Sequence, residues 1–344
     1  MATMADVARL AGVSIKTVSN VLNGYPYVRD STRHRVLAAV EELDYQVNAT
    51  ARSLRSGRTG MIGLAVPELG QPYFGELADE ILAAARRHGV QVLIEPTGYT
   101  RAGELAALRE PSRGLMDGLL FSPAVLTQDD AALLESVGAP LVLLGEQLFS
   151  PSVDHVTMRN VEGARAATEL LLDLGRRHIA VIGLLHKEGA GASGLRFAGY
   201  REALARRGID LEERLFGWAD DGWHRGNGAR AMGAILDSGA VVDGVVALNE
   251  ALALGAMFEL RSRGLTVPGE VSVVGFDDIE DAQFSKPALT TVDPGRLEIA
   301  DTAVELLCRR IAQRPTQRGL PQDPVLHLAD LKIIERESTA PLRS

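Results

Sequence analysis

The sequence predicts a small all-α unit at the N-terminus, followed by a larger α/β unit of two lobes in which helices cover parallel sheets. Within the first 45 residues, apolar side chains recur at helical spacing in three short stretches. From Met61 onward, continuous apolar runs alternate with amphipathic helical patterns, which is typical of parallel sheets covered on both faces. More than six such runs over about 280 residues are too many for one core, which favours two lobes.

The first helix of the all-α unit is bounded by clear signals. Thr3 can cap it and Asp6 can complete a capping box, while Val7 and Leu10 lie on one face. Gly12 ends it.

Two further helices follow in the same unit. Ser14 caps a helix from Ile15 to about residue 23, and a third helix starts at Asp30 or Ser31. Their inward side chains are expected to be Val18, Val21, Leu22, Val36, Val40 and Leu43. Two helices separated by Gly12-Val13-Ser14 form a helix-turn-helix arrangement. The alternative is a small three-helix bundle of no particular function.

Residues 46–60 differ in composition from the residues that precede them. They hold several arginines, two glycines and one large apolar side chain after Val47, namely Leu54. This composition predicts a short helix and a linker. Isolated helices of this length are marginal, so the segment cannot fold on propensity alone.

The larger unit is predicted to contain seven strands and eight helices. The strands are Met61–Pro67, Val90–Pro96, Asp117–Ser122, Leu141–Glu146, His178–Leu185, Val241–Leu248 and Val271–Phe276. The helices are roughly 74–89, 101–110, 129–138, 160–175, 194–207, 225–238, 250–263 and 296–312. Ligands of such sheets lie beyond the carboxyl ends of strands. By that rule the candidate ligand-binding segments are Pro67–Phe74, Phe121-Ser122, Glu146-Gln147, Asn249-Glu250 and Asp277-Asp278.

Charge is distributed unevenly along the 344 residues. The net charge is −9, but residues 1–58 carry eight Lys and Arg against five Asp and Glu, a net of +3. The remainder carries a net of −12. A basic head on an acidic body is typical of a DNA reader joined to a sensor.

The sequence also indicates the cellular compartment in which the protein is expected. Cys308 is the only cysteine, so no intramolecular disulfide can form, which fits a reducing environment. Neither an export signal nor an apolar stretch of membrane-spanning length is visible. We therefore expect a cytoplasmic protein that makes no use of a membrane.

Five motifs, in order along the chain, resemble those of the LacI/GalR family of transcription regulators. The first runs from Asp6 to Gly24 and includes Thr17-Val18-Ser19, and the second is Asn48-Ala49-Thr50-Ala51-Arg52-Ser53-Leu54. The others are Arg196-Phe197-Ala198-Gly199-Tyr200, Gly275-Phe276-Asp277-Asp278 and Pro287-Ala288-Leu289-Thr290-Thr291-Val292. The resemblance covers nearly the whole chain.

The resemblance implies a specific domain organisation. A helix-turn-helix DNA-binding domain would span 1–47, and a hinge helix with its linker 48–60. An effector-binding and dimerisation domain resembling periplasmic binding proteins would span 61–340. Its N-lobe would comprise about 61–160 plus 292–325, and its C-lobe about 161–291 plus 326–340. The chain would thus cross between the lobes near 160, 290 and 325.

For the head, the resemblance implies that Ile15, Lys16 and Asn20 read bases in the major groove. Ile15 can contact a thymine methyl, Lys16 can donate to guanine, and Asn20 can bond adenine through two hydrogen bonds. Many relatives carry Arg at the Asn20 position, so the operator sequence is left open. The expected phosphate contacts are Thr3, Ser14, Thr17, Ser19, Asn23, Tyr27, Arg29 and Thr32. Ser14 and Ser31 can also serve as helix caps.

In the hinge, the resemblance places Asn48, Ala51 and Leu54 against DNA. The paired Leu54 side chains of a homodimer would wedge into a minor-groove step of a near-palindromic operator and kink it. The alternative is that Leu54 packs on the head.

For the sensor, the expected effector contacts are Phe74, Phe121, Glu146, Arg196, Trp223, Asn249 and Asp277. Aromatic rings would stack on a ring or sugar face, and polar groups would bond its hydroxyls. A core role fits Phe74 equally well. The family usually has Asn-Asp at Asn249-Glu250 and Asp-Asn at Arg159-Asn160. These departures leave the effector open, with a sugar or sugar derivative favoured.

Two other classes of protein are alternatives: a solute-binding protein, which has the same two-lobed architecture, and an α/β enzyme acting on sugars or nucleotides. A solute-binding protein of a sugar transporter would need an export signal and would lack the first 58 residues. An α/β enzyme would need catalytic groups, and the sequence offers neither a nucleophile elbow nor a Walker loop nor metal-ligand spacing. The Gly-rich pattern at Gly189, Gly191 and Gly194 is a weak dinucleotide signal, since three other residues separate it from the strand. We expect no cofactor, no metal and no enzymatic activity. The sequence thus predicts an effector-controlled transcriptional repressor.

Overall fold

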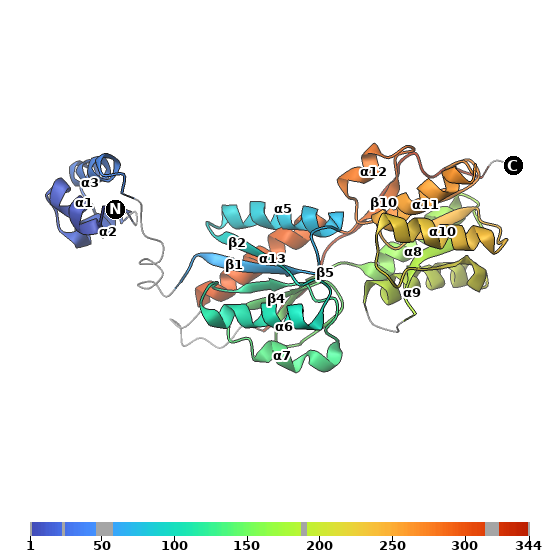
Figure 1. Ribbon diagram of the computed structural model, residues 1–344, viewed down its shortest axis with the longest axis horizontal. Coiled ribbons are helices and arrows are strands. Elements are labelled where there is room, and N and C mark those ends of the chain that lie inside the picture. Colours follow the sequence, from blue (N-terminus) through green and yellow to red (C-terminus); the bar gives the residue numbers. More distant parts are fainter. Residues whose placement is uncertain (1, 23–24, 46–57, 187–190, 314–322, 343–344) are drawn as a thin grey trace. The chain divides into compact units, whose positions relative to one another are not determined.

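The computed structural model describes residues 2–22, 25–45, 58–186, 191–313 and 323–342. The chain divides into two compact units, Met1–Thr59 and Gly60–Ser344, here named the head and the sensor (Figure 1). Across the described ranges, no helix is both long enough and apolar enough to cross a membrane.

The head contains helices α1 (Met4–Ala11), α2 (Ile15–Leu22) and α3 (Asp30–Glu42). The predicted capping box of α1 is present: Thr3 accepts the backbone N–H of Asp6 and Asp6 accepts that of Thr3. Gly12 ends α1 at φ +63°, a left-handed conformation that glycine adopts without strain. The core of the head is formed by Val7, Ala8, Ala11, Val18, Val21, Val36, Ala39 and Tyr45.

The first sheet of the sensor has the strand order β11-β5-β4-β3-β1-β2, and all of its pairings are parallel. Its strands are β1 (Met61–Val66), β2 (Gln91–Pro96), β3 (Leu119–Phe121), β4 (Leu141–Leu144), β5 (Asp154–Thr157) and β11 (Leu326–Leu328). Its helices are α5 (Pro72–Arg87), α6 (Arg101–Arg109), α7 (Ala132–Glu135) and α13 (Arg296–Gln313), with short 3₁₀ helices at Glu110–Arg113 and Gln128–Asp130.

The second sheet has the order β12-β10-β9-β8-β6-β7, with β12 antiparallel to β10. Its strands are β6 (Ile179–Leu184), β7 (Phe216–Trp218), β8 (Gly244–Ala247), β9 (Ser272–Phe276), β10 (Thr290–Asp293) and β12 (Lys332–Ile334). Its helices are α8 (Asn160–Asp173), α9 (Ala192–Arg206), α10 (Arg225–Asp237), α11 (Glu250–Ser262) and α12 (Glu280–Phe284), with a 3₁₀ turn at Glu213–Leu215.

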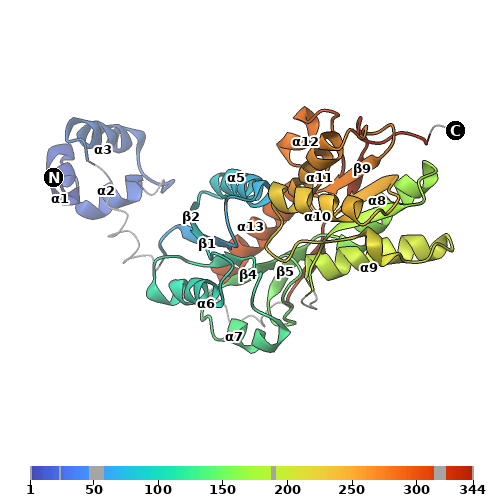
Figure 2. The same ribbon diagram turned by 45° about the vertical axis from the view of Figure 1, so that its right-hand side comes forward.

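Helices cover both faces of each sheet, as the apolar strands predict (Figures 1 and 2). In β6, Val181 packs with α8 and α9, whereas its neighbours Ala180 and Ile182 pack with α10 and α11. In β3, Leu120 joins the cluster of α5 and α13, and Leu119 joins that of α6 and α7. Alternate side chains therefore serve two cores.

The chain crosses between the sheets three times: after β5, after β10 and after β11. Two of the expected lobe boundaries need correction. β10 pairs with β9, so residues 292 and 293 belong to the second lobe. β11 pairs with β5, so the third crossing follows Leu328, a few residues later than expected.

Candidate functional site

In the head, α2 presents its first turn to solvent. The Ser14 hydroxyl oxygen accepts the backbone N–H of Thr17 at 3.1 Å, which caps the helix as predicted. Val18 and Val21 are buried against the head core, and this turns Ile15 and Lys16 outward. Asn20 is partly exposed. The helix can therefore present these three side chains to DNA bases.

Most of the other predicted head contacts are at least partly exposed. Tyr27 is 85% exposed and Arg29 is exposed, while Ser19 and Thr32 are partly exposed. Thr3 caps α1, since its hydroxyl oxygen accepts the backbone N–H of Asp6 at 3.3 Å and its hydroxyl donates to the Asp6 carboxylate at 2.6 Å. Four predicted contacts lie outside the described residues: Asn23, Asn48, Ala51 and Leu54.

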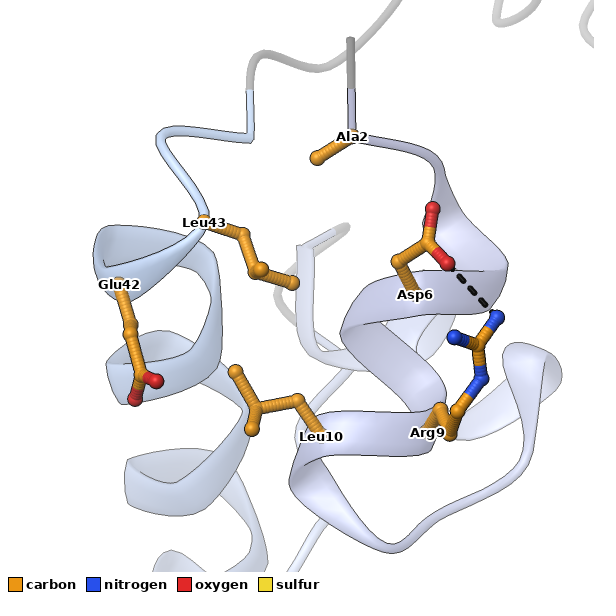
Figure 3. A pocket seen from close by; sticks show the side chains of 6 residues that line it. All are labelled: Ala2, Asp6, Arg9, Leu10, Glu42 and Leu43. Atoms are coloured by element: carbon orange, nitrogen blue, oxygen red, sulfur yellow. Dashed lines mark hydrogen bonds and ion pairs between the residues drawn. The ribbon is translucent and has the colours of Figure 1, made fainter.

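Leu10 lies at the surface of the head, although it shares a helix face with the buried Val7. It is 47% exposed because it faces an open hollow of about 520 Å³ between α1 and the end of α3 (Figure 3). Leu43 lines the hollow from the opposite side, and the exposed Asp6–Arg9 ion pair (2.7 Å) lies on its rim. We assign the hollow no ligand.

In the sensor, side chains from four segments meet where strands of both sheets end. Glu146 follows β4 of the first sheet, and Asn160 begins α8 directly after the first crossing. Arg196 projects from α9, and Asp277 follows β9 of the second sheet. With Trp223, which precedes α10, these residues are named the interlobe cluster.

Arg196 is the centre of the interlobe cluster. Its Nε donates to Asn160 Oδ1 at 2.7 Å, and the Asn160 amide donates to Glu146 Oε2 at 3.1 Å. Nη1 donates to the carbonyl of Leu248 and lies 3.5 Å from Asp277 Oδ1. The guanidinium also lies 3.6 Å from the centroid of the Phe276 ring. One buried guanidinium thus gathers three segments of the second lobe, and Asn160 extends this network to Glu146 of the first lobe.

The carboxyl groups of the cluster are in an unusual electrostatic environment. Burial raises the pKa of Asp277 to about 7, although Arg196 and Arg296 counteract the effect and Glu146 adds to it. Burial also raises the pKa of Glu146, against the opposing influence of Arg196. Perturbed carboxyl groups of this kind gather at functional sites more often than elsewhere.

Trp223 and Asn249 occupy fixed positions beside the cluster. The Trp223 indole N–H donates to the Gly183 carbonyl at 3.0 Å, and its ring centroid lies 5.7 Å from the Arg196 guanidinium. Asn249 caps α11 by accepting the Leu252 N–H at 2.8 Å, and its amide donates to the Trp223 carbonyl at 3.1 Å. Asn249 therefore positions Trp223.

The two predicted phenylalanines both contact the hydrophobic cores of the sensor, which for Phe74 is one of the two expected roles. Phe121 is fully buried among the apolar side chains of α6 and α7, so it belongs to the core and not to a ligand site. Phe74 packs against the core and against the edge of Tyr73, with ring centroids 5.4 Å apart.

Two polar members of the site were not predicted. The charges of Asp277, Glu146, Arg196 and Arg296 all act on the Tyr73 hydroxyl, and burial is the main cause of its raised pKa. Tyr73 lies in the selected stretch 67–74, so the strand-end rule pointed to its neighbourhood. Asn160 links Arg196 to Glu146, a role that only the geometry of the crossing reveals.

Family models match both units of the chain. A model described as "Bacterial regulatory proteins, lacI family" matches residues 3–48, which contain all three head helices. A "Periplasmic binding protein-like domain" model matches residues 168–339. The regulator AscG of Escherichia coli K12 is 34% identical over 314 residues, covering 90% of this chain and 91% of its own. The chain belongs to the lacI family of bacterial regulatory proteins.

Other members of the family resemble the chain over nearly its full length. The repressor PurR of Vibrio campbellii is 32% identical over 92% of this chain and 94% of its own. A Lac repressor dimer bound to operator and the anti-inducer ONPF superposes with a TM-score of 0.83 at 27% identity, covering 98% of this chain and 99% of that one. A lacI-family regulator from Sanguibacter keddieii reaches 47% identity and a TM-score of 0.74, covering 82% and 98%. This lacI-family chain is therefore a DNA-binding transcriptional regulator.

Proposed function

We propose that the interlobe cluster binds the small-molecule effector of this regulator, a sugar or sugar derivative. The observation that carries the proposal is the hydrogen-bond chain from Asp277 through the Arg196 guanidinium and the Asn160 amide to Glu146 of the first lobe. A ligand that bonds these groups would bias the relative position of the lobes. The structural relatives include a CelR–cellobiose complex at 30% identity and an Enterococcus faecium regulator with bound ribose at 25% identity.

The proposed reading of DNA rests on the first turn of α2. Ile15, Lys16 and Asn20 would contact base edges, because α2 exposes the first two and leaves the third partly accessible. Thr3, Ser14, Thr17, Ser19, Asn23, Tyr27, Arg29 and Thr32 would contact phosphates. Regulation of this kind takes place where the chromosome is, in the cytoplasm, and needs no enzymatic activity.

We propose that the regulator acts as a homodimer on a near-palindromic operator, joined mainly through the sensor. Large apolar side chains stay exposed there on β2, α11 and α12: Leu93 (38%), Phe258 (56%) and Phe284 (70%). The segment 48–60, with Asn48, Ala51 and Leu54, would complete the DNA contact in pairs. Light scattering that shows a monomer with full operator affinity would contradict the dimer. Equal DNA bending by Leu54→Ala and the parent would exclude the wedge.

One experiment separates the regulator from the two alternative classes. The full chain is used to select duplexes from a random library, and mobility shifts with the selected duplex are recorded at several salt concentrations. We expect specific binding that weakens as salt rises, because phosphate contacts release counterions. A panel of sugars is then screened by thermal shift, since a ligand at ~100 times its Kd adds about 2.7 kcal/mol of stability. Sugar binding without specific DNA binding would instead favour a solute-binding protein.

A further inference from the structure

The three segments that cross between the lobes contact one another in the sensor. The first crossing is 158–159, the second 294–295 and the third 329–331. The Ala329 N–H donates to the Thr157 carbonyl at 2.9 Å, which bonds the third crossing to the end of β5, where the first crossing begins. Any rotation of one lobe against the other must bend these three segments together.

The second and third crossings touch through their backbones. A Cβ placed on Gly295 would lie 2.5 Å from the Asp330 carbonyl oxygen and 3.1 Å from the Ala329 Cβ. Gly295 also has a φ of +77°, a left-handed conformation that favours glycine. Any larger residue would push the two segments apart, so their contact depends on this glycine.

The carboxylate of Glu298, in the first turn of α13, holds the third crossing at two points. Its Oε2 accepts the backbone N–H of Asp330 at 3.0 Å, and its Oε1 pairs with Nε2 of His327, on β11, at 2.7 Å. The Asp330 N–H is the main cause of a lowered pKa of Glu298, and His327 adds to it against the effect of burial. The carboxylate is therefore charged at neutral pH.

The first crossing acts on the same carboxylate through its charge. Arg159, the last residue of that crossing, also contributes to the lowered pKa of Glu298. An Asp at position 159, the residue that the family usually carries there, would repel Glu298, whereas Arg attracts it. Arg159 thus adds an attraction between the first crossing and α13.

The same turn of α13 reaches the second lobe directly. Two residues before Glu298, Arg296 donates to the carbonyls of Asp277 and Asp278 at 3.0 and 3.1 Å. One helical turn of the first lobe therefore contacts both a loop of the second lobe and the segments that join the lobes.

We propose that Glu298 is a positioning residue that fixes the relative arrangement of the lobes, by holding the third crossing against the first turn of α13. This turn is the pivot of lobe movement, and Arg159 strengthens the hold by attracting the Glu298 carboxylate. An effector that rotates the lobes must work against this hold, so Glu298 sets how readily the regulator changes state. The role is independent of which small molecule is the effector.

Hydrogen exchange of single amides, measured on the full chain without ligand, tests this role. Two amides report on the arrangement of the lobes because they donate from the second lobe to the first. They are the N–H of Ala192, which donates to Glu146, and the N–H of Glu280, which donates to Glu76 at 2.8 Å. Both lie outside the crossings, so a purely local change at Glu298 would not affect them.

In Glu298→Ala, we expect the Asp330 amide to exchange about tenfold faster or more, because it loses a bond to a charged acceptor. The amides of Ala192 and Glu280 should exchange about threefold faster or more, because the lobes separate more often. Glu305→Ala, at an exposed acid of the same helix, is the control and should exchange like the parent. Faster exchange of the Asp330 amide alone would show a local hydrogen bond and overturn the positioning role, as would unchanged exchange at all three amides.

A charge cycle tests Arg159 and covers the case in which Glu298→Ala destabilises the whole sensor. Glu298→Gln removes the charge but keeps an oxygen that can accept the Asp330 N–H. In the parent chain, Arg159→Asp should speed exchange of the two interlobe amides about twofold or more, and by less at high salt. In the Glu298→Gln chain the same change should have no effect, since the charge it repels is gone. Equal acceleration in both chains, or none in the parent, would overturn the proposal.

Discussion

At the scale of single residues, Arg196 has contacts that no shorter side chain could replace. Its guanidinium reaches Asn160, the Leu248 carbonyl and Asp277, and one of its faces lies against the Phe276 ring. We predict that Arg196→Ala lowers the response of operator binding to the effector at least about tenfold, the loss expected for charge-assisted bonds. Operator affinity without effector should stay unchanged, because the head is untouched.

Mobility shifts with and without the stabilising sugar would measure this response. Arg201→Ala, at an exposed position of the same helix, is the matched control and should behave like the parent. Loss of DNA binding together with normal sugar affinity would place Arg196 in a structural role instead.

Asp277 gives a prediction about pH. The pKa of its carboxyl group is raised from 3.8 to about 7 by burial, so between these pH values the folded chain keeps a proton that the unfolded chain has released. The contribution of this group to stability is therefore fully present below pH 3.8 and is lost as pH rises to about 7. Asn does not titrate, and it tolerates the positive φ of +113° at this position better than most residues.

The unfolding free energy of Asp277→Asn relative to the parent should accordingly increase with pH. The increase is at most about 1.4 kcal/mol for each pH unit and levels off above neutrality. Urea titrations of both chains at pH 5 and pH 8 would measure it. A difference that does not vary with pH would show that Asp277 titrates near its ordinary value.

The sequence could identify a site residue only where a strand end or a motif marked its position along the backbone. Glu146, Arg196 and Asp277 were predicted because strand ends and motifs mark them, and the structure brings them together. Phe121, which the same rule selected, is fully buried, because the last residue of a strand can still point into the core. The choice of Phe74 over its neighbour Tyr73 could not be made from the sequence, since the orientation of α5 decides which ring approaches the cluster.

At the scale of elements, the Gly199 of the Arg196 motif allows α8 and α9 to touch. A Cβ placed on Gly199 would lie 2.1 Å from the carbonyl oxygen of Val161, so any side chain would push the helices apart. A glycine likewise allows close contact between α10 and α11, where a Cβ on Gly255 would lie 1.9 Å from the Arg225 carbonyl oxygen. Because Arg196 and Asn160 belong to α9 and α8, this close approach also sets their contact.

We predict that Gly199→Ala destabilises the sensor by roughly 1–3 kcal/mol, the usual cost of overpacking, and weakens sugar binding. Gly226→Ala is the control, because its Cβ would meet only the flexible end of Arg230 at 3.8 Å. That variant should be as stable as the parent or slightly more stable, since alanine favours helices. Equal stability of the two variants, measured by urea unfolding, would contradict the close-approach role of Gly199.

The sequence predicted long elements well and short ones poorly. Helices α5, α8, α10, α11 and α13 begin and end within about two residues of their expected bounds, because amphipathic spacing defines them. Five strands of only three or four residues, too few to show a pattern, were missed: β5, β7, β10, β11 and β12. The helix expected at 129–138 is reduced to a 3₁₀ turn and the four residues of α7.

At the scale of the whole sensor, one turn connects the proposed ligand site to the contact between lobes. Asp277 and Asp278 have φ values of +113° and +48°, conformations that non-glycine residues adopt only when their surroundings hold them. Arg296 of the first lobe donates to both of their carbonyls, and Arg336 donates to the Asp278 carboxylate at 2.7 Å. Glu76, on α5 of the first lobe, accepts the N–H of Glu280 at 2.8 Å and pairs with Arg296.

Glu76 therefore contacts both the turn that carries Asp277 and the arginine that supports it. A ligand that moves Asp277 must disturb these contacts or be resisted by them, so Glu76 should contribute to the coupling between effector and operator binding. In Glu76→Gln, the side-chain oxygen can still accept from Glu280, but the amide group would face the Arg296 guanidinium, donor against donor. We predict that the factor by which the effector changes operator affinity falls about threefold to tenfold, within the usual range of coupling energies. Operator affinity without effector should remain close to that of the parent.

Asp79→Asn, at an exposed position of the same helix, is the control and should retain the full factor by which the effector changes operator affinity. Mobility shifts over a range of sugar concentrations give the factor for all three chains, and parental coupling in Glu76→Gln would mean that the lobes communicate by another route.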